Sequence, residues 1–97
     1  LIVVHSPLGA VAMTRAGEIA VQPSVNVPQG VIKGSNGAGD CFAAGILFGQ
    51  HEGWSLNESL KLAHASAAMS LRSTATTATV EHWQACLAQA DQWGWRA

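Results

Sequence analysis

The sequence predicts an α/β fold in which helices pack on the strands of a parallel sheet, next to a short β-hairpin. Three observations support this class. The chain opens on a continuous apolar run, Leu1 to Val4; apolar residues recur at helical spacing after Asp40 and after Ser55; and short apolar runs broken by turn residues lie between these parts. With 97 residues, of which 48% are hydrophobic, the chain has material for one domain and one core.

The first part of the chain is predicted to be extended. The run at residues 1–4 is typical of a strand that is covered on both faces. A hairpin is expected next, with strands at residues 10–14 and 18–21 around a turn at residues 15–17. Residues 25–27, which precede Pro28, and residues 31–33 are also expected to be extended.

Three helices are predicted after this region. The first spans residues 40–50, because Phe42, Ala43, Ile46 and Leu47 recur at helical spacing. The second begins at Ser55, which forms a capping box with Glu58, and continues through an alanine-rich face to about Leu71. The third is capped by Thr79 and runs over residues 80–93, with Trp83, Leu87 and Ala90 as its buried stripe.

Composition excludes several classes of partner. A net charge of −1, with only 11% charged residues, provides no basic surface for nucleic acid. No apolar stretch is long enough to cross a bilayer, so no membrane partner is expected. The two cysteines and four histidines lack the spacing of a metal site, so no metal ligands are predicted. We expect both cysteines to be reduced and mostly buried, and the protein to be cytoplasmic.

The loop that leads into the first helix carries the chemistry. Residues 34–39, Gly-Ser-Asn-Gly-Ala-Gly, allow close approach of a ligand to the backbone, and the first turn of the helix adds unpaired N–H groups. This arrangement suits a phosphate, and a carboxylate at Asp40 beside it would be a base next to an electrophilic phosphorus. From these residues alone, an Asp that only caps a helix after a tight glycine turn is an equally good interpretation.

The run from Gly34 to Gly45, GSNGAGDCFAAG, resembles the second signature of the ribokinase-like (PfkB) carbohydrate kinases, whose core is Gly-Ala-Gly-Asp. In that family the Asp is the catalytic base that takes the proton of the substrate hydroxyl, and the amides before it form an anion hole. The resemblance assigns these catalytic roles to Asp40 and to Gly37, Ala38 and Gly39. It covers nearly the whole chain and implies a fragment of the ribokinase-like fold.

The same resemblance implies a nucleotide site and its cofactors. Residues 4–9 are loosely similar to the family's nucleotide-side loop, and residues 73–78 fall at its adenine-side loop. The expected ATP-binding residues are Leu8, Gly9, Asn36, Gly37, Gly39, Thr74, Ala75 and Thr77. Mg²⁺ is expected to accompany ATP, with ligands largely outside this chain. Gly34 stands where many members have an Asp, which leaves monovalent-cation dependence open, and Ala75 stands where a glycine is usual.

The function that this resemblance implies is ATP-dependent phosphorylation of a sugar hydroxyl. Residues 1–97 would be the C-terminal part of the kinase domain, carrying the nucleotide-binding segment and the catalytic base, while the N-terminal substrate and lid part is absent. We therefore expect the 97-residue chain to be inactive by itself. Two alternatives stay open: a nucleoside or vitamin-like alcohol kinase of the same family, and a non-catalytic nucleotide-binding or interaction fragment. A homodimer of the full-length protein also stays open.

Overall fold

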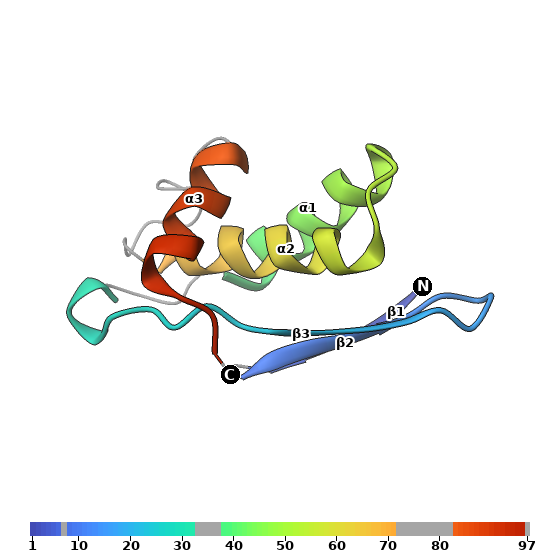
Figure 1. The fold of residues 1–97 in the computed structure, drawn as a ribbon, viewed down its shortest axis with the longest axis horizontal. Coiled ribbons are helices and arrows are strands. Elements are labelled where there is room, and N and C mark those ends of the chain that lie inside the picture. The colour runs from blue at the N-terminus through green and yellow to red at the C-terminus, as the bar shows by residue number, and fades with distance from the viewer. Residues whose placement is uncertain (7, 33–37, 72–82, 97) are drawn as a thin grey trace.

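The computed structural model describes residues 1–6, 8–32, 38–71 and 83–96. Three strands, β1 (Ile2–Ser6), β2 (Gly9–Met13) and β3 (Ile19–Pro23), are followed by the 3₁₀ turn η1 (Gln29–Val31) and three helices, α1 (Ala38–His51), α2 (Leu56–Ser70) and α3 (Trp83–Trp93). Figure 1 shows the three helices on one side of the sheet. The predicted α/β class, with helices packed on a sheet and a hairpin within it, is confirmed.

The hairpin forms where the sequence predicts it. Strands β2 and β3 pair antiparallel, with Met13 opposite Ile19 and Val11 opposite Val21. The turn between them has Gly17 at a φ of +94°, a conformation that side chains with a Cβ rarely adopt, and the Thr14 hydroxyl accepts a hydrogen bond from the Glu18 N–H at 3.1 Å.

The first strand differs from its prediction. Strand β1 pairs antiparallel with β2, so the sheet order is β1-β2-β3 and the parallel pairing expected for this strand is not seen among the described residues. Coverage of residues 1–4 on both faces is also wrong, because the helices lie on one face only and leave Ile2 65% and Val4 69% exposed. Two of the three cross-strand rows on the uncovered face are entirely apolar: Ile2–Met13–Ile19 and Val4–Val11–Val21.

The segment after Pro28 also differs. Residues 31–33 were expected to be extended, yet Val31 ends the 3₁₀ turn η1 and only Ile32 has an extended backbone; Lys33 lies outside the described residues. The turn begins after Pro28, whose φ of −61° is set by its ring. Three-residue 3₁₀ turns of this kind are common connectors, and they have no periodic sequence pattern from which they could be predicted.

The helices follow the predicted pattern. Helix α1 begins two residues before the expected start, and α3 is described from Trp83, so its expected cap, Thr79, lies outside the described residues. The capping box of α2 is confirmed: the Ser55 Oγ accepts a hydrogen bond from the Glu58 N–H at 3.1 Å and donates one to the Glu58 carboxylate at 3.0 Å. Among the described residues, no helix has the length and apolar character needed to cross a membrane.

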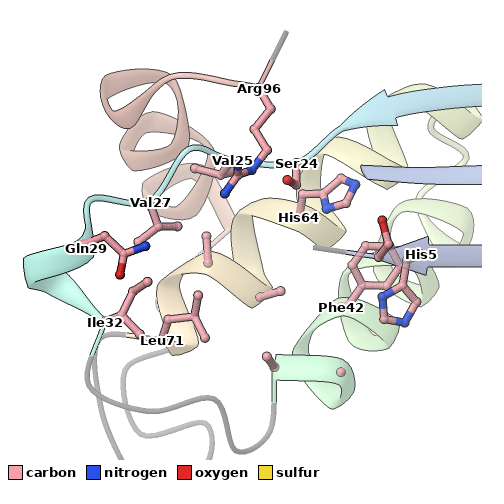
Figure 2. A pocket seen from close by; sticks show the side chains of 15 residues that line it. His5, Ser24, Val25, Val27, Gln29, Ile32, Phe42, His64, Leu71 and Arg96 are labelled. Carbon is pink, nitrogen blue, oxygen red and sulfur yellow. The ribbon is translucent and has the colours of Figure 1, made fainter. Parts of the chain in front are cut away.

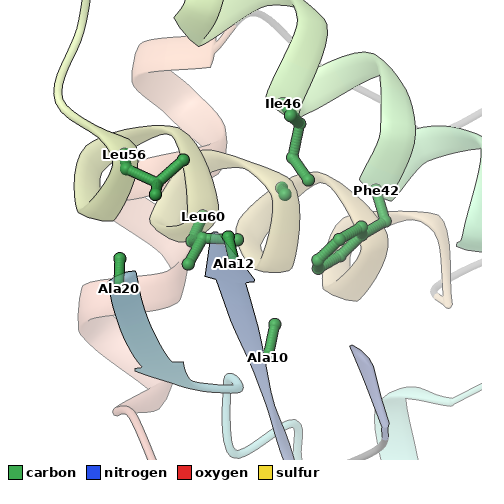
Figure 3. Close-up of a cluster of buried hydrophobic side chains, with 8 residues drawn as sticks. Ala10, Ala12, Ala20, Phe42, Ile46, Leu56 and Leu60 are labelled. Carbon is green, nitrogen blue, oxygen red and sulfur yellow. The ribbon is translucent and has the colours of Figure 1, made fainter. Parts of the chain in front are cut away.

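The core consists of two clusters that share helix α2. The first lies between the sheet and helices α1 and α2, as Figure 3 shows, and contains Ala10, Ala12, Ala20, Phe42, Ile46, Leu56, Leu60 and Ala63. The second lies between α2, α3 and the segment at Val25, and contains Val25, Leu62, Ala65, Ala68, Met69, Cys86 and Ala90. Trp93 and Trp95 pack against the second cluster.

Helix α1 approaches α2 closely because glycines face it. A Cβ at Gly45 would stand 2.7 Å from the Cα of Ala63, and one at Gly49 would overlap the Ser59 side chain. Small residues at such positions let two helix backbones come together, and a larger residue forces them apart.

This contact generates a prediction about stability. Gly45→Ala should lower the free energy of unfolding by about 1–3 kcal/mol, because the new methyl meets backbone atoms that cannot rotate away. The matched control is Gly39→Ala in the same helix, where nothing lies within 4 Å of the added Cβ. Urea unfolding followed by circular dichroism measures both; equal stability of the two variants would contradict the close approach.

Helix α2 is tied to β3 by a buried histidine. His64 is 5% exposed, and its Nε2 lies 3.1 Å from the carbonyl oxygen of Gln22, to which it donates a hydrogen bond. Burial lowers the pKa of His64, against the opposing effect of the Gln22 carbonyl and with a smaller contribution from His5. The folded protein therefore holds His64 neutral.

A second prediction follows from this pKa. Above the ordinary His value of 6.5, folded and unfolded chains both hold residue 64 neutral, so stability does not depend on its titration. Below that value the unfolded chain takes up a proton that the folded chain resists, and stability falls with pH by at most about 1.4 kcal/mol per unit. Denaturant melts between pH 7.5 and 5.5 should show a steeper loss in wild type than in His64→Gln; parallel curves would contradict the assignment.

Candidate nucleotide and catalytic site

The start of helix α1 places a carboxylate beside backbone N–H groups that have no acceptor within the helix. Asp40 lies in the first turn and is exposed, and its carboxylate makes no hydrogen bond or ion pair with another described residue. Because the helix begins at Ala38, the N–H groups of Ala38, Gly39 and Asp40 have no acceptor within the helix. Unpaired N–H groups and a helix dipole at one point favour an anion there.

A cavity of about 440 Å³ adjoins this helix start. Figure 2 shows His5 and Phe42 at one end of it, and Val27, Ile32 and Leu71 at the other. Ala38 and Gly39 line the cavity as well. The remaining lining residues are Ser6, Ser24, Val25, Gln29, His64, Ala67, Ala68 and Arg96. A cavity with an apolar wall and a few polar groups at the other side is the usual form of a small-molecule site.

The charge of the lining favours an anionic ligand. Among the described residues of the lining, the ionisable side chains are His5, His64 and Arg96, and none is a carboxylate; His64 is held neutral, so Arg96 provides the positive charge. The C-terminal segment delivers Arg96: its N–H donates to the Ser24 carbonyl at 2.8 Å, the Asn26 N–H donates to the Gly94 carbonyl at 2.7 Å, and Trp95 forms a bridge with Val25. The segment at residues 24–26 is thus paired with the C-terminal segment.

The structure brings together only some of the residues that the sequence singled out. Ala38 and Gly39 line the main cavity, with Asp40 next in the helix. Leu8, which is 70% exposed, and Gly9 line a separate hollow of about 400 Å³ beside β2 and β3, so they do not share the main cavity. The other predicted positions lie outside the described residues: Gly34, Asn36, Gly37, Thr74, Ala75 and Thr77.

The sequence placed His5 only within residues 4–9, the run similar to the nucleotide-side loop, and did not single out His64 or Arg96 as lining a site. A signal for His5 exists, because it follows Val3 by two residues in a strand and must therefore face the helices with it. The sequence carries no signal for Arg96, because contacts of the folded C-terminal segment bring it to the cavity and no motif marks it.

Metal and thiol chemistry find no support in the described part of the chain. No three His, Cys, Asp or Glu side chains of the described residues gather in a way that could hold a metal ion. Cys41 and Cys86 are reduced thiols and are buried, as expected. Burial raises the pKa of the Cys41 thiol, although a hydrogen bond with Ser70 opposes this, so Cys41 is a protonated packing residue beside Asp40.

Known structures share this fold. The chain superimposes on a ribokinase from Cryptococcus neoformans var. grubii serotype A in complex with ADP, with a TM-score of 0.70 and 24% identity over 86% of this chain. It also matches a nucleoside kinase of Methanocaldococcus jannaschii with a TM-score of 0.77 and 19% identity over 89%, and that of Burkholderia thailandensis in complex with inosine with a TM-score of 0.76 and 21% identity over 96%.

These matches cover 26%, 28% and 30% of the three known structures, so the chain spans less than a third of their length. No curated protein sequence matches it. A family model, described as pfkB family carbohydrate kinase, matches residues 1–83, which is most of the chain. With that match and the shared fold, the chain belongs to the pfkB family of carbohydrate kinases.

Proposed function

We propose that this chain is the nucleotide-binding and catalytic-base part of a kinase that transfers the γ-phosphoryl group of ATP to a hydroxyl of a sugar. One observation carries the proposal most: the cavity meets the first turn of α1 where Ala38 and Gly39 line it and Asp40 stands next to them. Two structures of similar fold, the ribokinase with ADP and an Arabidopsis thaliana ribokinase with ribose and ATP, support ATP as the donor and a sugar as the acceptor.

In this proposal Asp40 is the general base. Its carboxylate accepts the proton of the acceptor hydroxyl as the oxygen attacks the γ-phosphorus, and ADP leaves with the electron pair of the broken P–O bond. The backbone N–H groups of Ala38 and Gly39, with Gly37 before them, stabilise the charge that gathers on the transferred group. Because these donors are already oriented by the helix, no reorganisation is needed during the reaction.

The cavity fits the rest of a nucleotide. Val25, Val27, Ile32 and Leu71 provide an apolar wall for a base, and the Arg96 side chain and the N–H groups at the start of α1 suit phosphates. Leu8, Gly9, Asn36, Thr74, Ala75 and Thr77 remain proposed nucleotide contacts. Mg²⁺, when bound, would neutralise charge on the phosphates, and its ligands are proposed to lie outside this chain.

The acceptor and the state of the chain have alternatives. Two of the related structures are nucleoside kinases, so a nucleoside is the second candidate acceptor. Since the chain spans about a quarter to a third of these kinases, a fragment that binds nucleotide without turnover is the candidate from another class. A cytoplasmic location is part of the same proposal.

The test is the Asp40→Asn substitution in the longer kinase polypeptide that contains this segment. We expect phosphoryl transfer to fall by about 10²–10⁴-fold, because a general base is lost, while affinity for ADP changes little. ATP consumption is measured with a panel of sugars and nucleosides, which also names the acceptor.

Glu52→Gln is the matched control, since it removes a carboxylate just beyond the far end of α1. Equal turnover in wild type and Asp40→Asn would show that Asp40 is not the general base. Tight ADP binding without turnover on any acceptor would favour the non-catalytic fragment.

A further inference from the structure

His5 lies at one end of the main cavity, where its exposed ring stacks on Phe42. Strand β1 alternates, so Val3 and His5 face the helices, and Val3 packs against the first cluster. The His5 ring lies flat on Phe42, with centroids 4.4 Å apart and planes 18° apart, and Phe42 in turn meets the edge of His64 at 5.0 Å. Figure 2 shows His5 and Phe42 side by side at this end.

The ring nitrogens of His5 are not used by the fold. No hydrogen bond or ion pair joins them to any other described residue, whereas His64, the other histidine of the lining, has its Nε2 on the Gln22 carbonyl. A neutral imidazole carries one N–H donor and a protonated one carries two. The stacked ring is thus a positioned donor whose partner is missing from the described fold.

The surroundings of this donor indicate what it would bind. Ala38 and Gly39 line the same cavity, and the described residues of its lining include the ionisable side chains of His5, His64 and Arg96 but no carboxylate. A donor in a cavity lined without carboxylates favours an anion over a cation or a neutral sugar. The apolar wall at the other end matches a ligand that is anionic at one end and flat and apolar at the other.

We propose that His5 is a phosphate-binding residue for the nucleotide, with one ring N–H donating to a phosphate oxygen while Phe42 holds the ring in place. This assignment rests on the proposed nucleotide site and adds a side chain that the sequence signature does not contain. It predicts that His5 distinguishes a phosphorylated nucleotide from the nucleoside, since its partner is the phosphate.

The experiment distinguishes the effect of the His5 N–H donor from the effect of its ring stacking on Phe42. His5→Phe keeps a flat ring on Phe42 and removes the N–H donor, whereas His5→Asn keeps an N–H donor and removes the ring. Isothermal titration calorimetry of the 97-residue chain measures affinity for ADP and for adenosine. His51→Phe is the matched control, because His51 is an exposed histidine at the far end of α1 that does not line the cavity.

We expect His5→Phe to weaken ADP binding by about tenfold or more and to leave adenosine binding unchanged, since one hydrogen bond to a charged group is lost. His5→Asn should retain more ADP affinity than His5→Phe, and His51→Phe should bind as wild type. Thermal melts of each variant confirm that the fold is retained.

Three results would overturn the assignment. Unchanged ADP binding in His5→Phe would show that His5 does not bind a phosphate, and it would leave the proposed nucleotide site and function intact. An equal loss of ADP and adenosine binding gives His5 a packing role only. If the wild-type chain binds neither ligand, the proposed nucleotide site fails together with the role of His5.

Discussion

The close packing of α1 against α2 determines where the candidate site can be. Gly45 and Gly49 turn their bare backbones toward Ala63 and Ser59, so the two helices meet without side chains between them. At this distance Phe42 and Ile46 reach the alanines of the sheet and complete the first cluster. The start of α1, with Asp40, is therefore held near the end of β1, where His5 stands. A chain with larger residues at these glycines would separate the carboxylate from its cavity.

Helix α2 connects this arrangement to the rest of the fold. One of its sides belongs to the first cluster, through Leu56 and Leu60, and another to the second cluster, through Leu62 and Met69. Its polar residues also contact β3: Asn57 donates to the Val21 carbonyl at 3.3 Å, and His64 bonds with the Gln22 carbonyl. The cavity lies along the C-terminal half of α2, which lines it with His64, Ala67 and Ala68.

Local patterns predicted the elements of this fold well, and tertiary contacts account for what they missed. The capping box at Ser55 and the turn at Gly17 depend on neighbours within a few residues, and both form as expected. The apolar run at residues 1–4 is compatible with a strand covered on one face of the sheet or on both. Its exposure could therefore not be predicted from the sequence. The signature around Asp40 located the helix start, but the cavity beside it needs Val25, His64 and Arg96, which only folding brings together.

The tryptophans have a practical consequence for spectroscopy. The chain has four tryptophans and no tyrosine, and all four pack against the second cluster; Trp54 and Trp83 meet edge to face at 4.9 Å. The emission spectrum of the protein is therefore a reporter of how α3 and the C-terminal segment dock on α2. The sheet and the start of α1 hold no fluorophore of this kind. An optical signal that stays constant while the far-ultraviolet ellipticity changes would show that the two halves of the core come apart in separate steps.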